Sequence, residues 1–122
     1  MNKFGYLYIV VMAFVLIGCA KKDTLGNFDT EKWQKDINGC AGDRSTMVDD
    51  LVEVKKNLLG LYQKSIIKLI GQPEEQELSN RSQTYYSYYI DAAPSCESSA
   101  EDPRILEIRF TSLGIANEVN IK

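Results

Sequence analysis

The chain has 122 residues, with 14 Lys and Arg against 17 Asp and Glu, a formal net charge of −3 and no histidine. This length allows one small domain, and the mild acidity argues against nucleic acid as a partner, because proteins that bind nucleic acid present a basic face. The lack of histidine excludes Ser-His and Cys-His catalytic pairs and the commonest zinc ligand. Acid–base chemistry by two carboxylates remains formally open, but we expect no catalytic residue, no metal site and no cofactor.

The first 18 residues have the three-part pattern of a secretory signal peptide. Lys3 supplies the positive start, an uncharged and mostly apolar run extends from Phe4 to Gly18, and Cys19 follows. As a helix this run would span about 22 Å at ~1.5 Å per residue, which is less than the ~30 Å hydrocarbon core of a bilayer. A cleaved signal is therefore favoured over a transmembrane anchor.

The end of this run, Leu16-Ile17-Gly18-Cys19, resembles the lipobox of bacterial lipoproteins. The resemblance implies cleavage before Cys19, a diacylglycerol on its thiol and usually a further acyl chain, such as palmitate, on the new N-terminus. Two or more acyl chains anchor a protein stably, whereas one holds it only marginally. The alternative is an ordinary signal peptide with a chance cysteine. The residue after the cysteine is Ala20 and not Asp. This resembles the signal that sorts lipoproteins to the outer rather than the inner membrane in some bacteria.

Residues 19–27 are polar and predict a flexible tether, and residues 28–122 predict a single domain. Cys40 and Cys96 remain after lipidation of Cys19. Because two cysteines in predicted loops of an exported chain usually pair, we expect a disulfide between them. A reactive thiol and a metal-binding pair are the alternatives, but neither a Cys-x-x-Cys motif nor a histidine accompanies these residues.

The first helix should begin near Asp29 or Thr30, whose side chains can accept the free amide protons of a first turn. It should end at residues 38–39, where glycine tolerates the left-handed conformation. Trp33 and Ile37 fall four residues apart and share one face of this helix. We expect Trp33 to be a core anchor, with a ligand platform as the alternative.

A second helix is expected over residues 44–59, with Asp43 as its cap. The acidic side chains on its polar face, at positions 49, 50 and 53, predict a solvated surface, with a cation site as the alternative. A third helix should span residues 63–70 and end at Gly71, before Pro73. Residues 74–82 are polar and predict a loop. The expected core-facing stripe of the second helix is Met47, Val48, Leu51, Val52, Val54, Leu58 and Leu59.

The pattern then changes to the two-residue period of strands. Residues 84–90 are rich in strand formers, residues 104–111 alternate apolar with charged side chains, and residues 115–121 follow a tight turn. A long loop is expected over residues 91–103. The expected fold class is therefore α+β, with two to three helices packed on one face of a three-stranded antiparallel sheet.

Four tyrosines lie in the first expected strand. Tyr86 and Tyr88 share a face with Ile90 and should enter the core, whereas Tyr85 and Tyr89 lie on the other face. Exposed tyrosines can stack on sugars, peptides or bases, and they are also ordinary cross-strand packing residues. Tyr85 and Tyr89 are therefore candidate binding residues, with a packing role as the alternative.

From residue 58 to the C-terminus the chain resembles the SmpA/OmlA domain, the BamE-like fold of small outer-membrane lipoproteins. The resemblance rests on short structural motifs: a glycine after one helix, an apolar pair in a short helix, a Gly-x-Pro stop, a tyrosine-rich strand and a strand ending in Phe before a glycine turn. These are Gly60, Ile66-Ile67, Ile70-Gly71-Gln72-Pro73, Tyr86-Ser87-Tyr88, Leu106-Glu107-Ile108-Arg109-Phe110 and Gly114. Tyr62 replaces the usual polar cap, and the segment with Trp33 and Cys40 and the Cys96 loop lie outside the pattern. The chain is in this respect more similar to an uncharacterised lipoprotein family that shares the fold.

The resemblance implies an accessory of the outer-membrane β-barrel assembly machine. In inhibitors with the related β-lactamase-inhibitor fold, the sheet binds an enzyme. Fold alone does not decide function. The resulting expectation is a non-enzymatic lipid-anchored protein of the cell envelope, facing the periplasm or the surface, that contacts another envelope protein. The alternatives are a small-ligand or glycan binder that uses Tyr85 and Tyr89, and a carboxylate-based hydrolase of cell-wall material.

Overall fold

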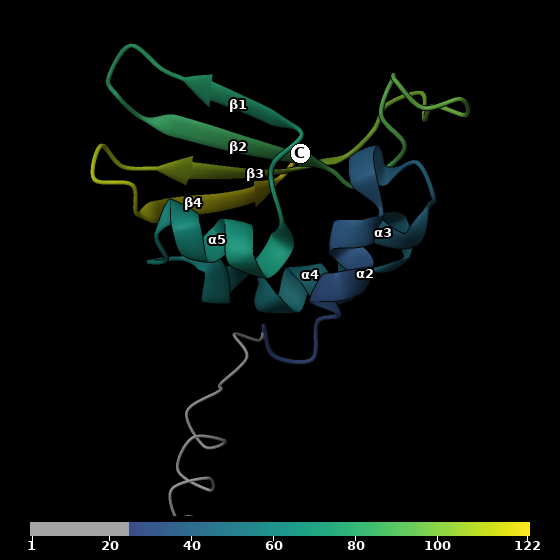
Figure 1. The fold of residues 1–122 in the computed structure, drawn as a ribbon, viewed down its shortest axis with the longest axis horizontal. Helices are drawn as coiled ribbons and strands as arrows, with labels where there is room; N and C mark the ends of the chain where they lie inside the picture. Colours follow the sequence, from purple (N-terminus) through teal and green to yellow (C-terminus); the bar gives the residue numbers. More distant parts are fainter. Residues whose placement is uncertain (1–24) are drawn as a thin grey trace, which may run out of the picture.

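The computed structural model describes residues 25–122, which form an α+β domain with an antiparallel sheet (Figure 1). The expected signal peptide, lipobox and lipidated Cys19 lie outside the described residues. The helical elements are α2 (Thr30–Lys35), the 3-10 turn η1 (Ile37–Gly39), α3 (Asp43–Thr46), α4 (Val48–Val54), the 3-10 turn η2 (Lys55–Leu58) and α5 (Gln63–Ile70). The strands are β1 (Glu75–Leu78), β2 (Thr84–Tyr89), β3 (Ile105–Phe110) and β4 (Ala116–Ile121). None of the helices in this part of the chain is long and apolar enough to cross a bilayer.

The sheet has four strands in the order β1-β2-β3-β4, and each strand runs antiparallel to its neighbours. The expected α+β class with an antiparallel sheet is confirmed, but the expected number of three strands is wrong. The additional strand is β1, which lies in the segment expected to be a loop. All four of its side chains are exposed, and its sequence shows no alternation of apolar and polar residues. Antiparallel pairing with β2 places the segment in the sheet.

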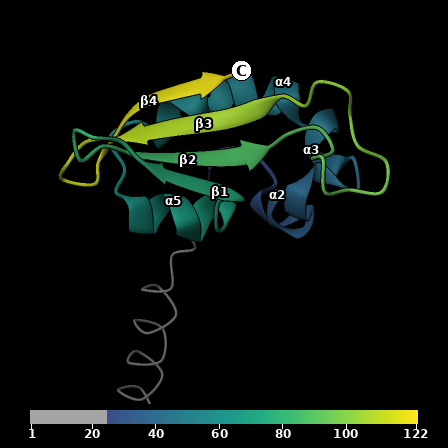
Figure 2. The ribbon, with the colours of Figure 1, turned by 90° about the horizontal axis from the view of Figure 1, so that it is seen from above.

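The helices lie on one face of this sheet, and α2 and α3 gather at one end of it (Figures 1 and 2). The inner face of the sheet supplies alternate residues of β2 and β3 to the core, as the two-residue period predicts. Trp33 lies at the centre of the core, with its ring 5.6 Å from that of Phe28 and 6.4 Å from that of Tyr88. It is completely buried, so a core anchor, and not a ligand platform, is its role.

The first helix begins as expected but ends early. Asp29 is the N-cap, and its side chain accepts a hydrogen bond from the amide of Lys32. The helix stops at Lys35, because the chain turns away through η1, and the Asp36 carboxylate accepts backbone amides of the following loop. Ile37, expected on the buried face with Trp33, is consequently 65% exposed.

The second expected helix is broken into α3, α4 and η2, with Met47 between the first two. The N-cap position is occupied by Gly42 in a left-handed conformation, and not by Asp43. Val52 and Leu59, expected in the core, are 49% and 46% exposed. Val52 lies on α4 beside the buried face of Leu51 and Val54, and Leu59 is the extended residue that ends η2. The inner part of the expected stripe, Met47, Leu51, Val54 and Leu58, is buried.

The third helix occupies residues 63–70 as expected, and Gly71 ends it with a φ of +85°. Strands β2, β3 and β4 lie where the two-residue period places them, within one or two residues at each end.

The packed domain begins three residues before the expected boundary at residue 28. Leu25 and Phe28 form an isolated antiparallel bridge and are both buried. The segment that contains them lies below the helix layer, on the side away from the sheet (Figure 1). Residues 25–27 are therefore continuous with the packed domain, and the preceding part of the expected tether lies outside the described residues.

Candidate functional site

The outer face of the sheet is not covered by any other element of residues 25–122 (Figure 2). Tyr85 and Tyr89 lie on this face and are half-buried, whereas Tyr86 and Tyr88 point inward and are buried, as the alternation predicted. In the pairing of β2 with β3, Tyr85 lies opposite Arg109 and Tyr89 lies opposite residue 105. The two candidate tyrosines thus form a ridge along β2, bordered by Arg109 and the apolar Ile105 on β3 and by the glutamates of β1.

Polar contacts hold the side chains beside this ridge. Tyr89 Oη donates a hydrogen bond to Glu75 Oε1 at 2.9 Å, and this bond, with burial and the negative charge of Glu75, raises the pKa of the Tyr89 phenol. Arg109 Nη2 lies 2.9 Å from Glu118 Oε2, across the β3–β4 pair. The face therefore carries two aromatic rings among mostly polar and charged side chains.

The outward carboxylates outnumber the cations on this face. Glu75, Glu77, Glu107 and Glu118 lie there against Arg109 and Lys122, which leaves a net charge of about −2. Lys122 Nζ lies 2.9 Å from Glu107 Oε1, and this hydrogen bond raises the pKa of Lys122. A partner that matches the face would carry basic side chains.

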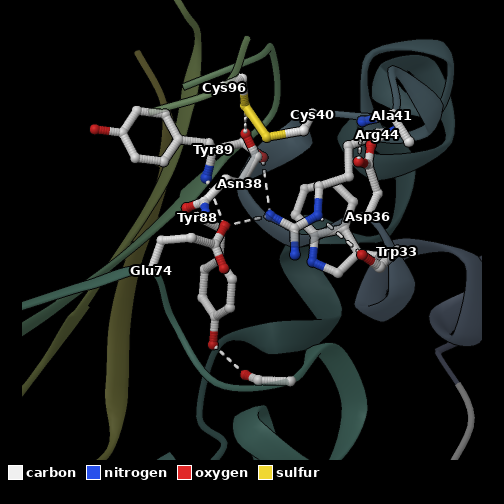
Figure 3. Close-up of polar contacts among 11 residues, drawn as sticks. Trp33, Asp36, Asn38, Cys40, Ala41, Arg44, Glu74, Tyr88, Tyr89 and Cys96 are labelled. Atoms are coloured by element: carbon white, nitrogen blue, oxygen red, sulfur yellow. Dashed lines mark hydrogen bonds and ion pairs between the residues drawn. A yellow bond between two sulfur atoms is a disulfide. The ribbon is translucent and has the colours of Figure 1, made fainter. Parts of the chain in front are cut away.

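A second arrangement, which the sequence did not reveal, is a buried ion pair between Arg44 and Glu74 (Figure 3). The two side chains are 2% and 7% exposed. Arg44 Nε donates to the Trp33 carbonyl oxygen at 2.9 Å, and Nη1 donates both to Glu74 Oε1 and, at 3.0 Å, to the Tyr89 carbonyl oxygen. Arg44 thereby connects the helical end of the domain to the end of β2. The helical spacing carried a signal, since position 44 precedes the buried positions 47 and 51 by three and seven residues.

Neighbouring contacts fix the position of this ion pair. Glu74 Oε1 also accepts a hydrogen bond from the Tyr89 amide at 3.1 Å, and Asp36 Oδ2 accepts one from the Arg44 amide at 2.9 Å. Tyr88 Oη donates to the Gly71 carbonyl oxygen at 2.8 Å. Burial raises the pKa of the Tyr88 phenol far above its usual range.

A cavity of about 460 Å³ adjoins the ion pair. It lies between the end of α2, η1 and the connection from α5 to β1. Its walls include Ile37, Asn38, Arg44, Ile70, Pro73 and Glu74. A second cavity of about 500 Å³ lies where the chain enters the domain, beside α4, and its charged wall residues are Asp50, Glu53 and Lys56. Neither of these two cavities is lined by tyrosine.

Cys40 and Cys96 are joined in a disulfide, with Cα atoms 5.4 Å apart. This is the pairing expected from the sequence, and it ties the loop after η1 to the long loop between β2 and β3. A backbone hydrogen bond from Ala93 to Asn38 lies alongside. Figure 3 shows the disulfide beside the ion pair, and neither Cys40 nor Cys96 has a free thiol.

Within residues 25–122, no three His, Cys, Asp or Glu side chains form a group that could hold a metal ion. The acidic residues of α4, Asp49, Asp50 and Glu53, are exposed. Comparison with known protein families, with curated proteins and with solved structures found no match for this chain.

Proposed function

We propose that this protein is a non-enzymatic, lipid-anchored component of the cell envelope that contacts another envelope protein through the outer face of its sheet. The observation that carries the proposal is the uncovered β2 ridge with Tyr85 and Tyr89. Tyrosine is enriched at protein interfaces because it combines a large apolar ring with a hydrogen-bonding tip. The resemblance of the C-terminal half to the SmpA/OmlA domain supports a role in outer-membrane assembly or maintenance.

The position of the first packed residues supports an orientation for the anchored domain. Only six peptide units separate Cys19 from Leu25, which span at most about 21 Å at ~3.5 Å per residue. The segment that starts at residue 25 runs along the side of the helices away from the sheet (Figure 1), and its Leu25 and Phe28 are buried. A lipid on Cys19 would therefore hold the helices toward the membrane and leave the sheet face directed away from it, where a partner can reach it.

A protein partner is favoured over a small ligand, because small ligands bind in concave pockets. The tyrosine ridge has charged neighbours on both sides, and the cavities beside the helices contain no tyrosine. A glycan bound by Tyr85 and Tyr89 is the second candidate function, favoured only by the presence of two rings on one strand.

Site-specific photocrosslinking in intact cells tests the contact. A photoreactive amino acid at position 85 should give one discrete adduct, whereas the same group at the exposed Glu31 of α2 should give none. Equal labelling from both positions, or no adduct from position 85, would contradict the proposed face.

A double variant separates binding from folding. In this experiment the photoreactive amino acid is placed at a third position, such as 87. The double change of Tyr85→Ser and Tyr89→Ser should abolish the adduct and change the melting temperature little. Tyr86→Ser is the matched control, because Tyr86 is 3% exposed and its truncation should destabilise the fold by about 3–5 kcal/mol. If the double variant destabilised the fold as much as Tyr86→Ser, the outer tyrosines would be packing residues.

The anchor has its own test. Cys19→Ala should abolish incorporation of labelled palmitate and release the protein from the membrane fraction. Continued labelling of this variant would contradict the lipoprotein proposal, whatever the crosslinking shows.

A further inference from the structure

We infer that the 460 Å³ cavity beside Arg44 and Glu74 is a binding site for an uncharged amide that carries a short branched apolar group. The inference is independent of the sheet face, because no residue of the β2 ridge lines this cavity. Its volume falls within the range of small-molecule sites, about 300–1,000 Å³.

The donors of Arg44 are incompletely used. A guanidinium has five N–H donors, and Arg44 uses one on Nε and both on Nη1 for the Trp33, Tyr89 and Glu74 oxygens. Nη2 makes no hydrogen bond within residues 25–122, although the side chain is 2% exposed. Buried donors without partners are rare, because each one loses its hydration without compensation.

The acceptors of Glu74 are also incompletely used. Oε1 accepts from both Arg44 and the Tyr89 amide, while Oε2 accepts from no residue of the described range. Among the side-chain nitrogen and oxygen atoms of residues 25–122, only Trp33 Nε1 is both fully buried and without a hydrogen-bond partner. Arg44 Nη2 and Glu74 Oε2 therefore retain access to open space, and both residues line the cavity.

The charge of this wall selects among ligands. The paired cation and anion cancel, so the wall offers one donor group and one acceptor without net charge. An amide can accept from Nη2 through its oxygen and donate to Oε2 through its N–H. A carboxylate has no proton to donate and would be repelled by Glu74, and an ammonium group would be repelled by Arg44.

The remaining wall is apolar and partly open. Ile70 and Pro73 line the cavity, and Ile37 lies at its rim with 65% of its surface exposed. An aliphatic group beside the amide would cover Ile37 and remove apolar surface from water on both sides. The same chemistry occurs in a peptide segment and in an acetamido sugar, so the source must be distinguished by experiment.

The test uses two probes of equal shape, isovaleramide and isovalerate, titrated into the isotope-labelled soluble domain (residues 20–122) at pH 7. Amide resonances of Ile37, Arg44 and Glu74 should shift saturably with isovaleramide, and isovalerate should bind at least about tenfold more weakly. Equal affinity of the two probes, or shifts confined to other residues, would overturn the inference. As a control, the spectrum of residues 20–122 is compared with that of the full detergent-solubilised chain, which shows whether the truncated domain keeps the native fold.

Two variants examine the two halves of the site. Ile37→Ser should weaken isovaleramide binding about tenfold, on the scale of one lost aliphatic contact, without changing the melting temperature, because Ile37 is exposed. Glu74→Gln should reverse the preference toward isovalerate, because Arg44 then carries an uncompensated charge. Unchanged binding by Ile37→Ser would overturn the site even if Glu74→Gln fails to fold.

Two larger probes distinguish the source of the amide. N-acetylvaline N-methylamide represents a peptide and N-acetylglucosamine represents an acetamido sugar. Tighter binding of the first assigns the site to a peptide segment, and tighter binding of the second assigns it to a glycan. Binding of neither probe, together with no effect of isovaleramide, would refute the site, whereas the photocrosslinking at position 85 would be unaffected.

Discussion

The guanidinium carbon of Arg44 lies 4.6 Å from the centre of the Trp33 ring, and Arg44 Nε donates to the carbonyl oxygen of the same tryptophan. A cation over an aromatic face is attracted by the ring quadrupole, more strongly when both groups are removed from water. Because the same guanidinium also bonds to Glu74 and to the end of β2, one side chain joins α2, α3 and the sheet.

Arg44→Met should destabilise the domain by about 3–5 kcal/mol, because it leaves the Glu74 carboxylate buried without its cation. The free energy of unfolding is to be measured by urea denaturation. Arg104→Met is the matched control, since the Arg104–Asp91 pair is 45% and 19% exposed and exposed pairs contribute less than about 1 kcal/mol. Equal losses in the two variants would show that the buried pair does not stabilise the domain.

Reduction of the Cys40–Cys96 disulfide should lower the free energy of unfolding by up to about 4 kcal/mol, the chain-entropy value for a loop of this length. The two cysteines are 56 residues apart in the sequence. Urea denaturation with and without reductant measures the change. The double variant Cys40→Ser/Cys96→Ser should be insensitive to reductant. Reduction of the wild-type protein should increase its intact mass by two hydrogen atoms. Two free thiols before reduction would contradict the pairing.

Tyr88 should make the domain sensitive to alkali. Burial raises the pKa of its phenol in the folded state, whereas the unfolded phenol titrates near ~10. Above pH 10 the folded state therefore binds one proton more than the unfolded state. The contribution of Tyr88 to the free energy of unfolding is fully present below that pH, and above it the free energy of unfolding falls by about 1.4 kcal/mol per pH unit.

Tyr88→Phe removes this dependence. Its stability at pH 7 should fall by about 1 kcal/mol through loss of the hydrogen bond to Gly71, but its decline between pH 10 and 11.5 should be shallower than that of the wild type. Urea denaturation across this pH range gives both slopes, and parallel slopes would contradict the assignment to Tyr88.

Gly39→Ala should disrupt the junction of η1 with the loop after β2. A Cβ at this position would lie 2.7 Å from the Asp91 carbonyl oxygen, and φ is +68°. Gly42→Ala is the matched control, since φ is +83° there and nothing lies within 4 Å of the added atom. The left-handed backbone costs each variant about 1–2 kcal/mol, and the collision should cost Gly39→Ala about 1–3 kcal/mol more. Equal melting temperatures of the two variants would show that the loop moves aside freely.

Local periodicity determined α5, the inner stripe of α4 and η2, and the two faces of β2 and β3. Tyr86 and Tyr88 alternate with Tyr85 and Tyr89 because successive side chains of a strand point to opposite faces, and burial of one face follows from hydrophobicity alone. The pairing of Cys40 with Cys96 was also predicted from the sequence, because the resemblance to a lipobox assigns Cys19 to a lipid and leaves these two cysteines.

The tertiary structure decided the conformation of those segments whose local sequence pattern is weak or points to a different structure. Strand β1 is held by backbone pairing, which is independent of side-chain type, so its exposed sequence Glu75–Leu78 carries no apolar pattern to detect. Arg44 and Glu74 are 30 residues apart, and each alone would predict a solvated charge. They are buried because each neutralises the other, and because Nε and Nη1 of Arg44 and Oε1 of Glu74 find partners in the core, a condition that no segment of the sequence can meet by itself.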